Sequence, residues 1–491
     1  MKISLIATLL MDYAGGTLTA FSMDKIRSCP PYGLYLLASI LRKKGHDVTI
    51  IDLVAQGSLS LSTFRKDIEE SDLIGISATS LSWPTAVDII YSIRHTFPDK
   101  LIAIGGIHAT IFDIYILSNF PVDFVLRGEG ELSFPLLIDA LEKKNSLQKV
   151  PNLSYVSDKQ IIRTSLHTAI SVPEMCELPI PDYSEIKVGV YKGLGLESSR
   201  GCPCNCSFCS TNYRRSWRGI SPERFIDRIY EIGAFRSSTI DGTIQIIDDE
   251  FTANRKRVLS IAKLLTKNNI KIPLIFDARA NDMTDESLVE SLVPHTHRFL
   301  VGAECGYDEG LKKIGKGTTC KKLEEAAKIM FKYGIADCCD FSFILGLPWE
   351  TKEDVLKTVR FACNLYTKYG VRIILQWFYL IPGSRLWQNA ANQGKINVSF
   401  YDNYGFFQNP ASFFAGVQLT PEEIWEVSDA ILPVISLSKI NDQGKELIQY
   451  AVPGVVQAYF NKESLRSVNK NCIDNLLELS SVAKNIGLSK E

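Results

Sequence analysis

Long apolar runs are absent from this chain of 491 residues. No uninterrupted stretch reaches the roughly 18 residues that a bilayer-spanning helix needs, so the sequence predicts no membrane span. An excess of one charge is also absent, since the formal net charge is −1. We therefore expect neither nucleic acid nor an anionic membrane surface as a partner held by bulk electrostatics.

A dinucleotide motif is missing as well. The turn after the first predicted strand carries no G-x-G-x-x-G, so a dinucleotide site is not supported there.

The first 16 residues, MKISLIATLLMDYAGG, have some features of a short signal peptide. A buried first strand followed by a turn at 11–16 fits them better, and we expect a cytoplasmic protein. Thiols stay reduced in that compartment, so the 12 cysteines indicate metal or catalytic chemistry before disulfides.

Residues 1–145 alternate between strand-like and helix-like patterns. The predicted strands are near-continuous apolar runs, which is typical of a parallel sheet covered on both faces. They lie at 2–10, 48–54, 72–79, 101–106 and 122–128, with helical patterns at 30–47, 61–70 and 83–98. The sequence thus predicts a doubly wound α/β domain of the Rossmann or flavodoxin type, which binds ligands at the carboxyl ends of its strands. A plain scaffold without a ligand is the alternative.

The alternation restarts after a proline-containing linker predicted at 146–190. Six strand–helix units over 191–394 indicate a parallel (β/α)6 partial barrel, whose chemistry belongs at the carboxyl ends of its strands. The strands are expected at 193–199, 242–248, 272–278, 297–304, 336–346 and 371–378. Residues 395–491 are expected to form a small, mainly helical C-terminal domain.

Four cysteines lie in the segment RGCPCNCSFCS at 200–210, directly after the first barrel strand. Cys202, Cys206 and Cys209 have the spacing C-x3-C-x2-C. Disulfides between residues so close would be strained, and structural zinc usually takes two separated cysteine pairs. Three thiolates on one loop can instead hold three irons of a 4Fe–4S cluster and leave the fourth iron open to a small molecule. We expect Cys204 to be a small side chain that points away from the cluster.

The cysteine loop in this strand context resembles the radical S-adenosylmethionine (SAM) superfamily. Phe208 before the third cysteine agrees with it. Further segments that resemble the family occur in order: DDEF at 248–251, GAECG at 302–306, KG at 316–317, ILGLPWET at 344–351 and IPGSRLW at 381–387. The N-terminal segments PPYGLYLLASILRKKGHDV, GGIHAT and RGEGE resemble the cobalamin-binding domain of cobalamin-dependent radical SAM enzymes. The resemblance covers roughly residues 1–390.

The resemblance implies that the three cysteines ligate the cluster and that SAM chelates the open iron. Reduction then releases a 5′-deoxyadenosyl radical, which abstracts hydrogen from an unactivated carbon. Strand-end residues are expected to bind SAM: Glu304 at the ribose, Arg279 or Lys316 at the carboxylate, and Asp249 near the amino group. The SAM-contacting residues predicted in full are Phe208, Asp249, Arg279, Glu304, Lys316, Ser342 and Gly346. For the charged residues of this set, a solvated strand-end charge is the structural alternative.

Many cobalamin proteins carry D-x-H-x-x-G, and this chain lacks it. Members of the radical SAM subgroup commonly lack it too, with other side chains shielding the cobalt. Ser80 or Trp83 is the candidate here, with packing at a helix start as the alternative for Trp83. Gly105, Gly106 and Gly128 are expected to let the cobalamin tail lie against backbone, unless they only serve tight turns.

The expected function is that of a cobalamin-dependent radical SAM enzyme, most simply a C-methyltransferase of a small molecule with a flavodoxin- or ferredoxin-like electron donor. The resemblance also allows a non-methylating outcome such as oxidative cyclisation. A cluster-bearing electron-transfer or binding protein without turnover is the alternative from another class, although such clusters usually have four protein ligands.

Overall fold

The computed structural model describes residues 1–14, 17–20, 28–166, 169–211, 213–405, 409–436 and 447–451. Two compact units divide the chain. The first comprises 1–198, 218–247 and 397–406, and the second comprises 199–217, 248–396 and 407–491. Each unit is described by itself below.

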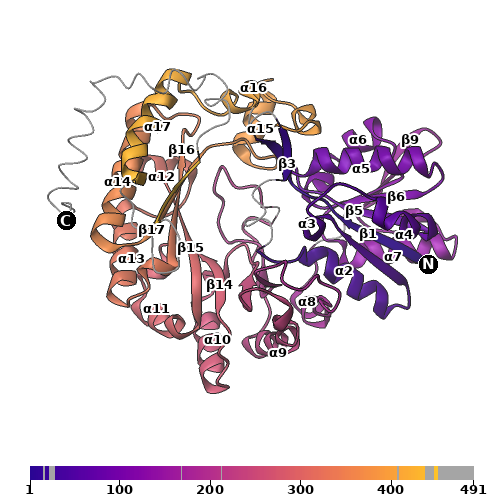
Figure 1. Cartoon of the computed structure of the whole chain (residues 1–491), viewed down its shortest axis with the longest axis horizontal. Coiled ribbons are helices and arrows are strands. Elements are labelled where there is room, and N and C mark those ends of the chain that lie inside the picture. The colour runs from indigo at the N-terminus through magenta and orange to yellow at the C-terminus, as the bar shows by residue number, and fades with distance from the viewer. Residues whose placement is uncertain are drawn as a thin grey trace. The chain divides into compact units, whose positions relative to one another are not determined.

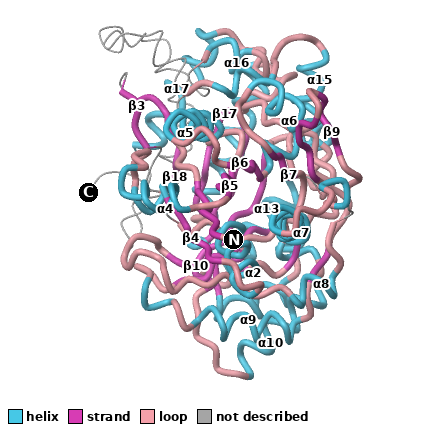
Figure 2. The backbone as a smooth tube through the Cα atoms, turned by 90° about the vertical axis from the view of Figure 1, so that its right-hand side faces the viewer, coloured by secondary structure: helices cyan, strands magenta, loops and turns pink. Residues whose placement is uncertain are grey.

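The first unit is built on a sheet in which β4, β1, β5, β6 and β7 are parallel neighbours in that order. The strands span Lys2–Ala7 (β1), Asp47–Asp52 (β4), Leu73–Ser77 (β5), Leu101–Gly105 (β6) and Phe124–Leu126 (β7). By chain order this is the 2-1-3-4-5 arrangement of flavodoxin-like folds. The doubly wound domain is therefore confirmed, and Figure 2 shows its strands in magenta.

Helices follow the strands; α2, α4 and α5 lie in the predicted helical stretches, whereas α3, α6 and α7 were not predicted. They are α2 (Tyr32–Lys43), α3 (Leu53–Gln56), α4 (Arg65–Glu70), α5 (Trp83–Thr96), α6 (Ile107–Asn119) and α7 (Gly130–Glu142). The core between sheet and helices includes Leu5, Leu34, Ala103 and Phe134, all buried. Burial of such side chains contributes roughly 1.5–3 kcal/mol each, which fixes the sheet that carries the glycine-rich strand ends.

Two antiparallel strand pairs of this unit were also not predicted. Met11–Ala14 forms a strand (β2) that pairs antiparallel with Thr17–Ala20 (β3), where the sequence suggested only a turn; Gly15 and Gly16 lie outside the described residues. Within the proposed linker, Leu153–Ser157 (β8) and Gln160–Arg163 (β9) form an antiparallel hairpin on β7. The linker was predicted from the prolines of ELPIPDY at 177–183, and strands as short as β8 and β9 show little periodicity in the sequence.

The first unit also holds the start of the second strand–helix series. Gly193–Leu196 (β10) pairs in parallel with Thr243–Ile246 (β13), and α8 (Val172–Glu177) and α9 (Pro222–Gly233) belong to the same unit. Ser199–Arg200 (β11) and Arg218–Gly219 (β12) are two-residue strands at the ends of the cysteine loop.

The second unit continues the series as parallel strands in chain order. These are β14 (Leu274–Ala278), β15 (Thr296–Glu304), β16 (Cys339–Leu345), β17 (Arg372–Trp377) and β18 (Ile448–Tyr450). Its helices are α10 (Arg255–Lys267), α11 (Glu286–Leu292), α12 (Asp308–Ile314), α13 (Cys320–Lys332), α14 (Lys352–Tyr369), α15 (Arg385–Asn392), α16 (Pro410–Phe414) and α17 (Pro421–Ser436). Figure 1 shows α10, α11, α13 and α14 in succession alongside these strands.

The strand–helix order expected for the barrel is therefore present. Strand β18 was not predicted: it adds to β17 from a region expected to be mainly helical. Residues 452–491, the rest of the expected C-terminal domain, lie outside the described residues. None of the described helices is long and apolar enough to cross a bilayer.

Candidate active site

The cysteine loop is anchored at both ends by backbone hydrogen bonds. The Cys202 N–H donates to the Tyr213 carbonyl (3.1 Å), and the Ser207 N–H donates to the Ile314 carbonyl (2.8 Å). Gly201 has a φ of +80°, and an added Cβ would lie 1.8 Å from the Ser216 carbonyl oxygen. Only glycine fits that position, so the RG that precedes the first cysteine is a steric requirement of the loop.

The three predicted ligands are thiols partly withdrawn from water. Burial raises the pKa of Cys202 to about 12, and it also raises the pKa of Cys206 and Cys209. The nearby cations Lys316 and Arg279 oppose this effect at Cys206. Buried thiols resist ionisation without a positive partner, so this donor set suits a group that binds as metal thiolate.

Arg279 and Lys316 lie beside the loop. Arg279 immediately follows β14, and its guanidinium donates to the Lys316 carbonyl and to the Cys204 sulfur. Burial alone would lower the pKa of Lys316, but the Glu304 carboxylate outweighs it and holds the pKa above its usual value. The charged Lys316 Nζ donates to Glu304 Oε1 at 2.7 Å.

Glu304, the last residue of β15, has an unusual backbone. Its φ of +67° lies in the left-handed region, and the register of β15 against β16 shifts between Gly302 and Glu304. A Cβ added to Gly302 would lie 2.4 Å from Glu304 Oε1 and 2.5 Å from Lys316 Nζ. Strained residues of this kind cluster at functional sites, and here the strain turns a carboxylate toward a buried lysine.

Asp248, Asp249 and Glu250 follow β13 after one intervening residue, Ile247. Asp249 is exposed and accepts the Gly201 N–H at 2.9 Å, while Asp248 is buried and accepts the Ser199 hydroxyl at 2.6 Å. Burial raises the pKa of Glu250 to about 7. Because Glu250 interacts electrostatically with Cys202 and Arg279, it belongs to the same site, although the sequence analysis assigned it no role.

The remaining predicted SAM contacts lie on neighbouring elements. Ser342 is half-buried within β16, Phe208 is half-buried on the cysteine loop, and Gly346 follows β16 with a φ of +78°. Glu350, which the sequence analysis missed, organises that turn. Its carboxylate accepts the N–H groups of Gly346 and Leu347, each at 2.8 Å. The signal was available in the LPWE segment, because buried backbone donors of a tight turn need an acceptor.

The expectation that Cys204 points away from the cluster stays a prediction. Its sulfur contacts the Arg279 guanidinium, and its side chain and backbone both interact with the Cys202 thiol. The prediction rested on chain spacing alone, and spacing does not fix the direction of a side chain in an irregular loop.

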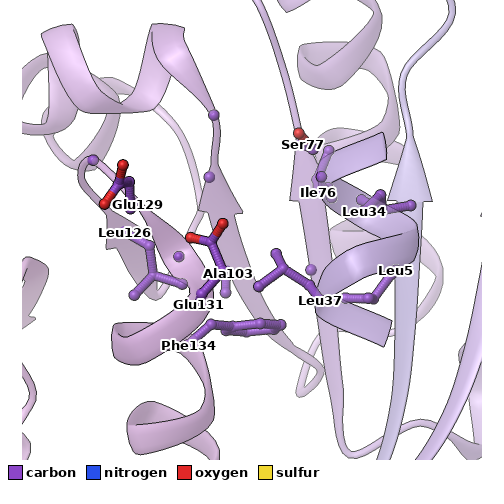
Figure 3. A pocket seen from close by; sticks show the side chains of 16 residues that line it. Leu5, Leu34, Leu37, Ile76, Ser77, Ala103, Leu126, Glu129, Glu131 and Phe134 are labelled. Carbon is purple, nitrogen blue, oxygen red and sulfur yellow. The ribbon is translucent and has the colours of Figure 1, made fainter. Parts of the chain in front are cut away.

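A cavity of about 230 Å³ lies at the carboxyl ends of the strands in the first unit. Gly105, Gly106 and Gly128, the three glycines expected at the cobalamin tail, all line it together with apolar side chains. Figure 3 shows Leu37 and Phe134 turned toward each other at this cavity. An added Cβ at Gly105 would meet nothing within 4 Å, whereas one at Gly106 would lie 2.5 Å from the Ala78 carbonyl. Gly105 therefore leaves space open, and Gly106 permits a tight turn.

Ser80 and Trp83 do not line this cavity. Trp83 is fully buried, stacks on His108 with centroids 4.5 Å apart, and donates from Nε1 to Asp402 at 2.9 Å. Ser80 Oγ lies 3.0 Å from His108 Nδ1, and burial lowers the pKa of His108 to about 3. Trp83 is therefore packed in the core at the start of helix α5, which is the structural alternative given for it above.

Comparison with known proteins agrees with both sites. Residues 196–362 match the radical SAM superfamily, and residues 27–138 match the B12 binding domain. An uncharacterized methyltransferase of Pyrococcus horikoshii is 30% identical over 451 residues, covering 88% of this chain and 94% of that protein. An anaerobic magnesium-protoporphyrin IX monomethyl ester cyclase of Synechocystis is 28% identical, covering 62% of this chain and 63% of that protein.

Among solved structures, the cobalamin-dependent radical enzyme OxsB, with aqua-cobalamin and SAM bound, superimposes with a TM-score of 0.67. The match has 19% identity and covers 89% of this chain and 67% of that one, so it shows a shared fold. Fold and cysteine loop together define an iron–sulfur radical enzyme. The chain belongs to the radical SAM superfamily, among the members that carry an N-terminal B12 binding domain. Its cofactors are a 4Fe–4S cluster, SAM and cobalamin.

The Gly302→Ala substitution should weaken SAM binding by about tenfold or more, equivalent to at least about 1.4 kcal/mol. The added Cβ and the Lys316–Glu304 ion pair cannot both keep their positions, so the pair must move. Equilibrium dialysis of the reconstituted protein with radiolabelled SAM measures the Kd. Gly33→Ala, where nothing lies within 4 Å of an added Cβ, is the matched control. Wild-type affinity in a folded Gly302→Ala protein would contradict a role of this ion pair in binding.

Proposed function

We propose that this enzyme transfers a methyl group to an unactivated carbon of a small-molecule substrate. The observation that carries the proposal is the combination of two sites in one chain: a three-thiol loop flanked by Arg279 and Lys316, and a glycine-lined cavity in the B12 binding domain. The similarity to a protein named as a methyltransferase, across nearly its full length, favours methyl transfer over other radical outcomes.

The bound cofactors supply the radical and the methyl group, and the protein positions them. In the proposal Cys202, Cys206 and Cys209 hold the cluster, and Lys316 and Arg279 place positive charge beside it. Glu304 accepts hydrogen bonds from the ribose hydroxyls, which a carboxylate with two acceptor oxygens suits. One oxygen, Oε1, is already engaged by Lys316, and the left-handed backbone holds the carboxylate at the strand end.

Other residues complete the proposed SAM site. Asp249 stands near the amino group from a position fixed by the Gly201 N–H, and either Arg279 or Lys316 pairs with the carboxylate. Phe208, Ser342 and Gly346 provide the remaining contacts, with the backbone at Gly346 fixed by Glu350.

For cobalamin, the proposal assigns the tail to the cavity lined by Gly105, Gly106 and Gly128. A direct contact of Ser80 or Trp83 with the cobalt face would require these side chains to leave the core, since both are buried. We therefore give Ser80 and Trp83 the role of holding His108 and helix α5 in place.

The substitution Gly105→Leu should abolish stoichiometric cobalamin binding, because its side chain would occupy the open space of the cavity. The backbone at Gly105 does not have a positive φ, so the variant is expected to fold. The absorbance of bound cobalamin after gel filtration gives the readout. SAM binding in the second unit should persist, and full cobalamin occupancy of the variant would contradict this placement of the tail.

Product analysis tests the proposed reaction. Anaerobically reconstituted enzyme is incubated with SAM, a reductant and cobalamin, and 5′-deoxyadenosine and S-adenosylhomocysteine are quantified. A variant with alanine at Cys202, Cys206 and Cys209 is the control. We expect about four irons per chain and both products, each dependent on the three cysteines.

The outcomes separate the alternatives. Formation of 5′-deoxyadenosine without S-adenosylhomocysteine would indicate a radical reaction other than methyl transfer. The cyclisation named for the Synechocystis relative is an example. Absence of SAM cleavage after reduction would favour a cluster protein without turnover. The partners that we propose are a small-molecule substrate and an external flavodoxin- or ferredoxin-like electron donor in the cytoplasm.

A further inference from the structure

One side of the cysteine loop packs against two distant segments of the second unit. The Ser207 N–H donates to the carbonyl of Ile314, the last residue of helix α12, at 2.8 Å. The Ser207 carbonyl accepts the N–H of Leu386 in helix α15 at 3.1 Å. The Asn205 carbonyl accepts the Arg385 guanidinium at 2.7 Å. Three stretches that are far apart in the sequence are therefore held together at this side of the loop.

These three stretches carry positive charge without any carboxylate. Residues 199–217 contain three arginines, residues 310–322 contain five lysines, and residues 380–399 contain one arginine and one lysine. None of the three stretches contains Asp or Glu, whereas the whole chain has a formal net charge of −1. The cysteine loop thus lies in a local excess of positive charge, which the composition of the chain as a whole does not reveal.

Three arginines of these stretches form a surface patch, which we call the arginine patch: Arg214, Arg215 and Arg385. Arg215 and Arg385 are exposed, and Arg214 is half-buried. Arg214 donates to the carbonyls of Thr211 and Gly383. Within the described part of the chain, no carboxylate forms an ion pair with any of the three arginines. Their charges can therefore attract an anionic partner.

A polar hollow of about 340 Å³ lies at the arginine patch. Its lining residues are Asn205, Thr211, Arg214 and Arg215. The Thr211 N–H donates to the Cys209 sulfur at 3.5 Å, and the backbone of Arg214 forms a β-bridge with that of Cys202. The wall of the hollow is thus in direct contact with two of the three proposed cluster ligands.

The sulfur of the third proposed ligand lies close to the surface at Gly315. The Cys206 sulfur is 3.9 Å from the Gly315 carbonyl oxygen, and Gly315 is exposed. A Cβ added to Gly315 would lie 3.5 Å from the Asn205 carbonyl oxygen and 3.9 Å from the Arg385 guanidinium. This exposed glycine, which has no side chain to keep a partner away, therefore contacts both the Cys206 sulfur and the surroundings of the arginine patch.

These observations favour a protein that carries electrons over other anionic partners. Nucleic acids, acidic proteins and small anions are all attracted to cations, but only an electron donor gains from contact beside the ligand sulfurs. Electron-transfer complexes are commonly small and transient, with interfaces below about 1,200 Å². Charge complementarity raises the association rate of such complexes, which suits arginines that have no carboxylate partner of their own.

We propose that the arginine patch is the docking surface of an acidic, flavodoxin-like electron carrier. The carrier binds with its carboxylates against Arg214, Arg215 and Arg385, beside the Cys206 and Cys209 sulfurs. One electron passes from the reduced carrier to the cluster, so the carrier is oxidised by one electron, the cluster is reduced by one, and no bond forms or breaks. This inference rests on the proposed function, which requires an external donor, and it does not depend on methyl transfer.

The test uses charge reversal at the two exposed arginines in anaerobically reconstituted full-length protein. Asp tolerates the left-handed backbone of Arg215, whose φ is +58°, and Glu suits the first turn of helix α15. Arg215→Asp and Arg385→Glu are therefore expected to fold. Lys263→Glu is the matched control, because Lys263 is exposed on helix α10 and forms no ion pair with a described residue. Iron content and circular dichroism are recorded for every protein.

Each protein is driven either by sodium dithionite or by flavodoxin reduced with its NADPH-dependent reductase, and the initial rate of 5′-deoxyadenosine formation is measured. We expect the double variant Arg215→Asp/Arg385→Glu to lose about tenfold or more in kcat/KM for flavodoxin, because attraction becomes repulsion. Its dithionite-driven rate should stay within about twofold of wild type, since a small reductant needs no docked complex. Added salt should lower the flavodoxin-driven rates of wild type and Lys263→Glu, because ions screen exposed charges.

Equal kcat/KM for flavodoxin in wild type and the double variant would overturn the proposal. So would a loss of similar size with both reductants, because the arginines would then act on the site itself and not on docking. A wild type that dithionite drives and reduced flavodoxin does not would overturn it as well. Absence of 5′-deoxyadenosine from wild type with dithionite would refute the proposed function and, with it, the docking surface, so the dithionite-driven rate tells the two failures apart.

Discussion

Buried thiols ionise to thiolates only when a positive charge lies beside them. The side chains around the cysteine loop of the second unit are arranged to meet this requirement. The cysteine loop withdraws its sulfurs from water, and this burial raises the pKa of Cys202 to about 12. Two cations lie beside the loop: Arg279, which follows strand β14, and Lys316, which follows helix α12. Lys316 is in turn balanced by Glu304, because a buried cation without a partner is costly. The thiols, the two cations and the carboxylate interact electrostatically, and the Lys316–Glu304 ion pair offsets the cost of burying both charges.

Three glycines lie at positions where a side chain would clash with a neighbour or fill a cavity. Gly201 lets the loop turn against the Ser216 carbonyl, and Gly302 leaves room for the Lys316–Glu304 ion pair. In the first unit Gly105 leaves a cavity open at the end of β6. These positions are not interchangeable: Gly201 needs a positive φ, whereas Gly302 and Gly105 need only the absence of a side chain. The same residue type thus serves a backbone requirement at one site and a volume requirement at two others.

The sequence predicted the parts of this architecture that depend on periodicity and spacing. Apolar runs identified both strand–helix series, and the C-x3-C-x2-C motif identified the cluster loop. Elements without such a pattern were not predicted. They include the short hairpin β8–β9 and the strand β18, which pairs with β17 although the two strands are far apart in the sequence. Side-chain direction was also beyond reach, because the orientation of Cys204 and the burial of Trp83 are set by tertiary contacts with Arg279 and His108. Glu350 could have been found from the LPWE segment, because buried N–H groups of a tight turn need an acceptor.

The proposed function requires that one iron of the cluster binds SAM directly. Electron–nuclear double resonance on the reduced protein, with SAM labelled by ¹⁵N at the amino group and ¹⁷O at the carboxylate, measures this most directly. We predict hyperfine coupling of both labels to the cluster in the wild-type protein. A cluster signal that shows no coupling to either label, although SAM is bound, would contradict the account.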